Sequence, residues 1–96
     1  MIRYYNNEII DELVKEDITL VDFYADWCGP CKMLGSVLEK LDYNIVKINT
    51  DQFPELSKQF AVMSIPTVLI YKDGKNVAKF IGFRSKEEIE NIINDL

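Results

Sequence analysis

The sequence predicts an α/β domain in which a mixed β-sheet carries helices on both faces. Short runs of β-branched and aromatic residues alternate with longer stretches in which apolar residues recur at helical spacing. One of these runs is apolar almost throughout, as expected of a strand that is covered on both sides. The 96 residues provide enough chain for one hydrophobic core and no more. We therefore expect a single domain over residues 1–96 with the element order βαβαβαββα.

The chain begins with a predicted strand and a predicted helix. Ile2–Tyr5 is strand-like, and Asn6 or Asn7 supplies a side chain that can cap the helix after it. This helix is expected to end near Glu16. Its apolar residues, which fall on one helical face, are Ile9, Ile10, Leu13 and Val14.

Thr19–Ala25, with the sequence TLVDFYA, is predicted to be the central strand, and a helix is predicted after it. Between the two lies the motif WCGPCK at residues 27–32. Pro30 fits the first turn of the helix, where its missing N–H group costs little. The apolar residues of this helix are Met33, Leu34, Val37, Leu38 and Leu41. The motif therefore joins the end of a strand to the start of a helix.

A third strand and a short helix are predicted in the middle of the chain. Asn44–Asn49 is strand-like. Pro54 can open a helix that turns Leu56 and Phe60 towards the core.

A hairpin and a final helix complete the predicted domain. Thr67–Tyr71 and Val77–Ile81 are strand-like runs joined through Asp-Gly at residues 73–74, which favours a tight antiparallel hairpin. Ser85 and Glu88 have the spacing of a helix capping box. The apolar stripe that follows is Ile89, Ile92, Ile93 and Leu96.

Composition limits the classes of partner. A net charge of −5, from 11 basic and 16 acidic residues spread along the chain, leaves no basic stripe for a nucleic acid backbone. The N-terminal sequence MIRYYNNEII lacks the apolar core of a signal peptide, and no stretch approaches the roughly 20 apolar residues of a membrane span. We expect a cytoplasmic monomer that binds neither nucleic acid nor membrane.

The chain has two cysteines, Cys28 and Cys31, and no histidine. Two cysteines three positions apart cannot form the several cross-links of a small secreted domain, which favours a reactive pair. A metal site needs further thiolate or imidazole ligands, so none is expected within one chain. A metal site shared between subunits is the alternative that stays open.

A Cys-x-x-Cys motif at a helix N-terminus provides what thiol–disulfide exchange needs. The first cysteine faces the unpaired amides and the positive end of the helix dipole, which lower a thiol pKa. The second lies one turn further along and can displace whatever the first has captured. We expect Cys28 to attack a disulfide and Cys31 to resolve the mixed disulfide.

Asp22 interrupts the predicted central strand. A carboxyl group in that covered setting is expected to have a raised pKa and could pass a proton to or from Cys31. The alternative is that Asp22 lies at a strand edge, solvated or paired with a surface base. Lys47, on the strand predicted next, is a candidate charge partner.

Four motifs occur in a characteristic order: VDFYADWCGPCK at 21–32, SIPT at 64–67, KDG at 72–74 and Gly82. Together they resemble the thioredoxin family over essentially the whole chain. The resemblance implies the thioredoxin fold and a dithiol–disulfide oxidoreductase without a cofactor. Its implied activity is reduction of disulfides in client proteins, with a separate thioredoxin reductase to re-reduce the cysteine pair.

The resemblance also implies roles for individual residues. Cys28 is the nucleophile, Cys31 is the resolving thiol, and Asp22 is the buried acid that assists Cys31. Lys47 falls where the family places a neighbour of that acid. The residues implied to surround the cysteines as a docking surface are Trp27, Gly29, Pro30, Ile65, Pro66 and Gly82.

Pro66 is implied to be cis and to lie beside the disulfide, which leaves the Ile65 backbone free to pair with an extended client segment. The chain also departs from the family pattern. Ser36, preceded by Gly35, stands where the family usually has a helix-kinking proline, and a kink can still form at such a pair. Tyr24 replaces a commoner tryptophan, and Phe83 adds apolar bulk to the docking rim.

Two classes of function remain open from the sequence. The first is a general protein disulfide reductase, and the second is a redox-idle binding module that uses the same docking surface as a subunit of a larger complex. An oxidase or isomerase of the same fold is a third reading, disfavoured because the Gly-Pro pair resembles the reducing members of the family.

Overall fold

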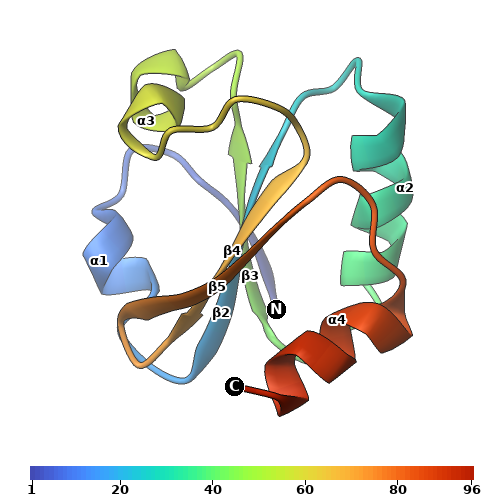
Figure 1. The fold of residues 1–96 in the computed structure, drawn as a ribbon. Helices are drawn as coiled ribbons and strands as arrows, with labels where there is room; N and C mark the ends of the chain where they lie inside the picture. The colour runs from blue at the N-terminus through green and yellow to red at the C-terminus, as the bar shows by residue number, and fades with distance from the viewer.

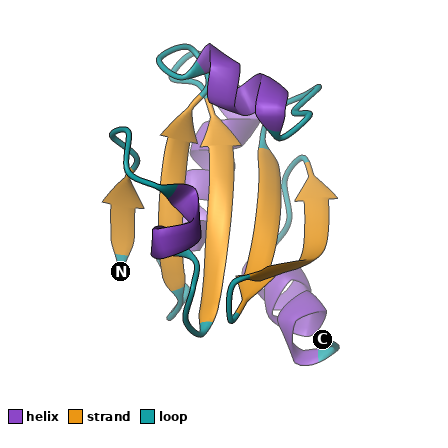
Figure 2. Cartoon of the chain, turned by 90° about the vertical axis from the view of Figure 1, so that its left-hand side faces the viewer, coloured by secondary structure: helices purple, strands orange, loops and turns teal.

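A five-stranded mixed sheet forms the centre of the computed structural model, which describes residues 1–96 (Figures 1 and 2). The strands stand in the order β1-β3-β2-β4-β5. β1, β3 and β2 run parallel, whereas β4 runs antiparallel to both β2 and β5. Their bounds are Ile2–Tyr4 (β1), Ile18–Tyr24 (β2), Asn44–Asn49 (β3), Thr67–Lys72 (β4) and Lys75–Ile81 (β5). The predicted mixed sheet and the central place of β2 are confirmed.

Four helices cover the two faces of the sheet. α1 and α3 lie on one face, and α2 and α4 lie on the other (Figure 1). Their bounds are Ile10–Leu13 (α1), Gly29–Leu38 (α2), Pro54–Gln59 (α3) and Lys86–Asn94 (α4). The predicted order of elements is confirmed, and no helix has the length and apolar character needed to span a membrane.

Each face of the sheet has its own hydrophobic core. Leu20 belongs to the cluster under α2 and α4, whereas its neighbour Val21 belongs to the cluster under α1 and α3. Successive residues of a strand point to opposite faces, so β2 must be apolar on both. This two-sided burial is the reason that β2 has a nearly continuous apolar sequence.

The first helix is shorter than predicted, and its predicted cap is wrong. Asn7 takes a left-handed backbone conformation with φ of 69°, and the N-cap of α1 is Ile9, without a side-chain cap. Asparagine tolerates that conformation better than most residues, so the chain turns at Asn7 and the helix starts later. Ile9 is consequently 69% exposed, whereas Val14, beyond the last helical residue, is fully buried.

The apolar stripes of the other helices are confirmed in part. Leu34 and Leu38 of α2 and Ile89 and Ile93 of α4 are buried. Leu41 is buried as predicted but lies beyond the end of α2. The exceptions, which are exposed, are Met33 and Leu96.

Two local sequence signals, one for a hairpin turn and one for a helix start, are confirmed. Asp73 and Gly74 both have positive φ, as a tight β-hairpin requires. Ser85 and Glu88 form the reciprocal hydrogen bonds of a capping box at the start of α4. α2 runs without interruption through Gly35 and Ser36.

Candidate active site

The site forms where β2 ends and α2 begins. Cys28 is the N-cap residue of α2, and its extended backbone turns the side chain back over the first helical turn. The backbone amide of Cys31 donates to the Cys28 Sγ across 3.2 Å. Pro30 lies in that first turn, as predicted, where a free N–H is not needed. The start of the helix thus holds a sulfur against one of its unpaired amides.

Cys28 and Cys31 are joined by a disulfide and are both buried. They form a small cluster with Ala25 at the end of β2, against which Tyr24 and Ile65 pack. The sequence-based pairing of the two cysteines at this strand–helix junction is confirmed. The structure brings no group of three or more His, Cys, Asp or Glu side chains together as a metal site.

The loop before β4 approaches the disulfide. The carbonyl oxygen of Ile65 lies 3.9 Å from Cys28 Sγ, and the Ile65–Pro66 peptide bond is cis, as implied by the resemblance. The Ile65 N–H and carbonyl groups make no backbone hydrogen bond. The Pro66 carbonyl accepts from the Gly82 amide at 2.8 Å, and Gly82 has a φ of 85° that suits glycine. Two loops are therefore fixed together beside the sulfurs.

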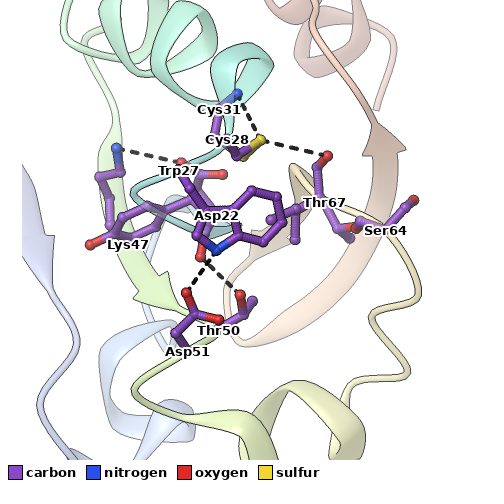
Figure 3. Close-up of a disulfide and its surroundings, with 11 residues drawn as sticks. Asp22, Trp27, Cys28, Cys31, Lys47, Thr50, Asp51, Ser64 and Thr67 are labelled. Atoms are coloured by element: carbon purple, nitrogen blue, oxygen red, sulfur yellow. Dashed lines mark hydrogen bonds and ion pairs between the residues drawn. A yellow bond between two sulfur atoms is a disulfide. The ribbon is translucent and has the colours of Figure 1, made fainter.

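Trp27 is 71% exposed, so it is a surface residue and not core filling. Its indole N–H donates to Asp51 Oδ2 at 2.9 Å, and Figure 3 shows the indole pointing toward that carboxylate. Asn49 holds the Asp51 loop, because its side-chain oxygen accepts from the Asp51 amide. Asp51 was not among the residues predicted from the sequence. Its signal was its position just after β3, since parallel strands end at the same edge of a sheet.

Asp22 and Lys47 face each other from adjacent strands, in register. Asp22 is fully buried, and neither carboxylate oxygen has a hydrogen-bond partner. Lys47 Nζ lies 3.7 Å from Asp22 Oδ2 (Figure 3). Burial raises the pKa of Asp22 to about 6, against the opposing pull of the Lys47 charge. The alternative of a solvated carboxylate at a strand edge is wrong, because β2 is central and both of its faces are covered.

A cavity of about 210 Å³ lies beside this pair. It is lined by side chains from β1, β2, β3 and the start of α2, so it connects the neighbourhood of Lys47 with that of Cys31. The lining residues are Tyr4, Tyr24, Ala25, Asp26, Cys31, Lys32 and Lys47.

The residues implied to form a docking surface surround the disulfide unevenly. Gly29 and Pro30 are exposed, and Ile65 and Gly82 are half-buried. Pro66 is buried, so it is not itself an exposed part of this surface. Two apolar side chains flank these loops in the sequence and are exposed: Met63 and Phe83.

Comparison with known proteins agrees with this geometry. The thioredoxin family model matches residues 2–95. A thioredoxin of Staphylococcus saprophyticus is 46% identical over 89 residues, which cover 86% of each chain. A thioredoxin of Listeria monocytogenes is 42% identical over 98% of this chain and 97% of its own.

The solved structure of a mutant thioredoxin from Halobacterium salinarum superposes with a TM-score of 0.87, at 31% identity, over 98% of this chain and 88% of its own. The family match over residues 2–95 includes every strand of the sheet, the cysteine pair and the loop that carries Pro66. The chain belongs to the thioredoxin family.

Proposed function

We propose a two-step exchange for the protein disulfide reductase activity that family membership and the cysteine pair give this chain. The observation that carries the proposal is the Cys28 sulfur at the N-cap of α2, with the Cys31 amide 3.2 Å away. A thiolate formed at that position gains an amide donor and the positive end of the helix. Cys28 is therefore assigned the attack and Cys31 the resolution.

The exchange conserves atoms and electrons. The Cys28 thiolate attacks one sulfur of a client disulfide, whose S–S bond breaks, and the other client sulfur leaves as a thiolate. Cys31 then loses its proton and attacks the Cys28 sulfur. This attack displaces the client sulfur that was bonded to Cys28, which leaves as a thiolate. Two electrons pass to the client, which becomes a dithiol, and the protein keeps a Cys28–Cys31 disulfide.

We assign to Asp22 the role of accepting the proton of Cys31 in the second step. A pKa of about 6 suits a group that must exchange a proton near neutral pH. The cavity beside the pair supports this role, since it is lined both by Cys31 and by Lys47, whose ammonium lies 3.7 Å from the Asp22 carboxylate. Lys47 is assigned the charge that favours the ionised form of Asp22.

Clients are proposed to dock as extended segments. The N–H and carbonyl of Ile65, which make no backbone hydrogen bond, can pair with a client backbone beside the Cys28 sulfur. The proposed contact surface around that pairing comprises Trp27, Gly29, Pro30, Pro66 and Gly82.

A separate thioredoxin reductase is the proposed source of electrons, and disulfide-bearing proteins are the clients. The proposed setting is the cytoplasm, where thiols are kept reduced and a reversible disulfide can cycle. We also propose that the protein acts as a monomer and that residues 1–96 form one domain. The family match over residues 2–95 supports the single domain.

A disulfide-reduction assay driven by dithiothreitol tests the cysteine roles. Cys28→Ser is expected to abolish turnover. When reduced Cys31→Ser is mixed with an oxidised client in the absence of dithiothreitol, it is expected to accumulate a mixed disulfide with the client on Cys28. The competing reading, a binding module with idle cysteines, predicts partner binding that is indifferent to Cys28→Ser and no trapped client. Full turnover by Cys28→Ser would overturn the proposed mechanism.

Asp22→Asn tests the proton step. We expect it to slow resolution of the mixed disulfide more than its formation, because formation does not use the Cys31 proton. Stopped-flow measurement of the two phases separates the steps. Equal slowing of both would remove Asp22 from the mechanism.

A further inference from the structure

The ammonium of Lys47 lies in a narrow enclosure. Besides the Asp22 carboxylate at 3.7 Å, Lys47 Nζ lies 4.6 Å from the centre of the Tyr24 ring and 5.9 Å from that of Tyr4. The two rings meet edge to face, with centroids 6.5 Å apart. On the side of α2, a Cβ added at Gly35 would lie 3.3 Å from Nζ. The Lys47 side chain is 12% exposed as a result.

The position of this ammonium matters because Asp22 has no hydrogen-bond donor. The separation of 3.7 Å is longer than a hydrogen bond, so the pair interacts through charge and depends on where the ammonium sits. Beside the pair, the cavity of about 210 Å³ offers Lys47 another place, nearer to solvent. A further interaction is needed to hold the Lys47 ammonium next to Asp22 and out of the cavity.

An aromatic ring face attracts a cation within about 6 Å of its centre, and does so more strongly where water is excluded. Both rings meet this distance. We propose that Tyr24, with Tyr4 behind it, is a positioning residue for the resolving step: its ring holds the Lys47 ammonium against the Asp22 carboxylate. The inference rests on the proposed function, in which Asp22 takes the proton of Cys31.

The test has to account for each charged or titratable group around the Lys47 ammonium. Asp22 and Tyr24 come from β2 and Tyr4 from β1, while Asp26 and Lys32 line the cavity from the β2–α2 junction and α2. Burial raises the pKa of Tyr24, so its ring stays neutral over the range in which Asp22 titrates. The attraction comes from the ring, and the hydroxyl is not required for it.

The two possible roles of the Tyr24 ring predict opposite changes in the Asp22 pKa when the ring is removed. If the ring holds the ammonium, its removal lets Lys47 move into the cavity, and the Asp22 pKa rises because the favourable charge recedes. If the ring only keeps water from Asp22, its removal hydrates the carboxyl group, and the Asp22 pKa falls. For the first case we expect a rise of about half a pH unit to one pH unit.

The experiment is an NMR titration of the Asp22 carboxyl carbon in the oxidised protein, which needs no turnover. Tyr24→Leu removes the ring, and Tyr24→Phe is the matched control that keeps it. Tyr24→Leu should raise the pKa, Tyr24→Phe should leave it within about 0.2 of the parent value, and Tyr4→Leu should raise it less. Tyr4 is exposed, so that variant still reports if Tyr24→Leu fails to fold.

A double-mutant cycle shows whether the ammonium carries the effect. In a Lys47→Met background, Tyr24→Leu should no longer raise the Asp22 pKa. A fall of the pKa in Tyr24→Leu, an equal rise in Tyr24→Phe, or a rise that persists without Lys47 would each overturn the proposal.

Kinetics then links the enclosure to the reaction. A rise of one pH unit lowers the ionised fraction of Asp22 about twofold at pH 7 and about fivefold at pH 6. The resolving rate of Tyr24→Leu should fall by the same factors, with formation of the mixed disulfide unchanged. A pKa that rises without this kinetic change overturns the role of Asp22 in the proposed function. An unchanged pKa, with resolution still slowed by Asp22→Asn, overturns this inference alone.

Discussion

Asp22→Asn is expected to make the oxidised protein more stable at neutral pH and to leave its stability unchanged in acid. The parent carboxyl group is fully buried without a hydrogen-bond partner, and burial raises its pKa to about 6. An ionised group in this position costs folding free energy, whereas a neutral amide of the same shape does not carry that charge.

The size of the effect follows from linkage. In the unfolded chain the carboxyl group titrates near its ordinary value of 3.8, so the folded state holds its proton more tightly by about two pH units. At 1.36 kcal/mol for each unit, the cost of ionising Asp22 in the folded protein reaches about 3 kcal/mol. Below pH 4 both states are protonated and the cost vanishes. It grows as the pH rises through 4 to 6 and is nearly complete at pH 7.

Urea unfolding of both proteins, with the disulfide intact, measures this difference at a series of pH values from 3.5 to 8. The advantage of Asp22→Asn should climb from near zero to about 3 kcal/mol, with most of the change between pH 4 and pH 6. Asp26→Asn, at an exposed carboxylate four residues away, is the control and should differ by less than about 0.5 kcal/mol throughout. A difference for Asp22→Asn that does not vary with pH would refute the reasoning.

Two further predictions concern the neighbourhood of the site. Gly35→Ala should raise the free energy of unfolding in urea by about 0.5 to 1 kcal/mol, because alanine favours a helix more than glycine does. The added Cβ would lie 3.3 Å from Lys47 Nζ, and the flexible end of that side chain can shift to accommodate it. A lower free energy of unfolding would mean that Lys47 cannot move. Asp51→Ala should lower the fluorescence anisotropy of Trp27, the only tryptophan, by freeing its indole, whereas Asp51→Asn keeps an acceptor and should not. Equal anisotropy in both variants would show that packing alone holds the indole.

Much of the fold could be predicted because its signals are local. The continuous apolar sequence of β2 placed it in the centre of the sheet, and Asp73-Gly74 and the Ser85 capping box marked the hairpin and the last helix. The start of α1 could not be predicted in this way. Asn7 can either cap a helix or take a left-handed turn, and its neighbours in the sequence do not decide between them.

The cysteine pair was evident from its spacing, but its surroundings depend on contacts between distant segments. The ion pair of Asp22 with Lys47 exists because β2 and β3 align these two residues. The sequence offered Lys47 as a candidate partner on the next predicted strand, but it did not give the register that places the two side chains together. The contact of the Lys47 ammonium with the Tyr24 ring and the hydrogen bond from Trp27 to Asp51 also join residues that are far apart in the sequence. Sequence spacing carries no record of such register.

The position of β1 at the edge of the sheet affects how readily the wall of the site opens. This strand has three residues and a single neighbour, β3, and it brings Tyr4 opposite Lys47 at the margin of the sheet. Short marginal strands detach far more often than central ones, so hydrogen exchange should be fastest there and slowest in β2. The cysteine pair thus follows directly on the central strand of the sheet, whereas Tyr4, which lines the cavity beside Lys47, belongs to the strand expected to open most readily.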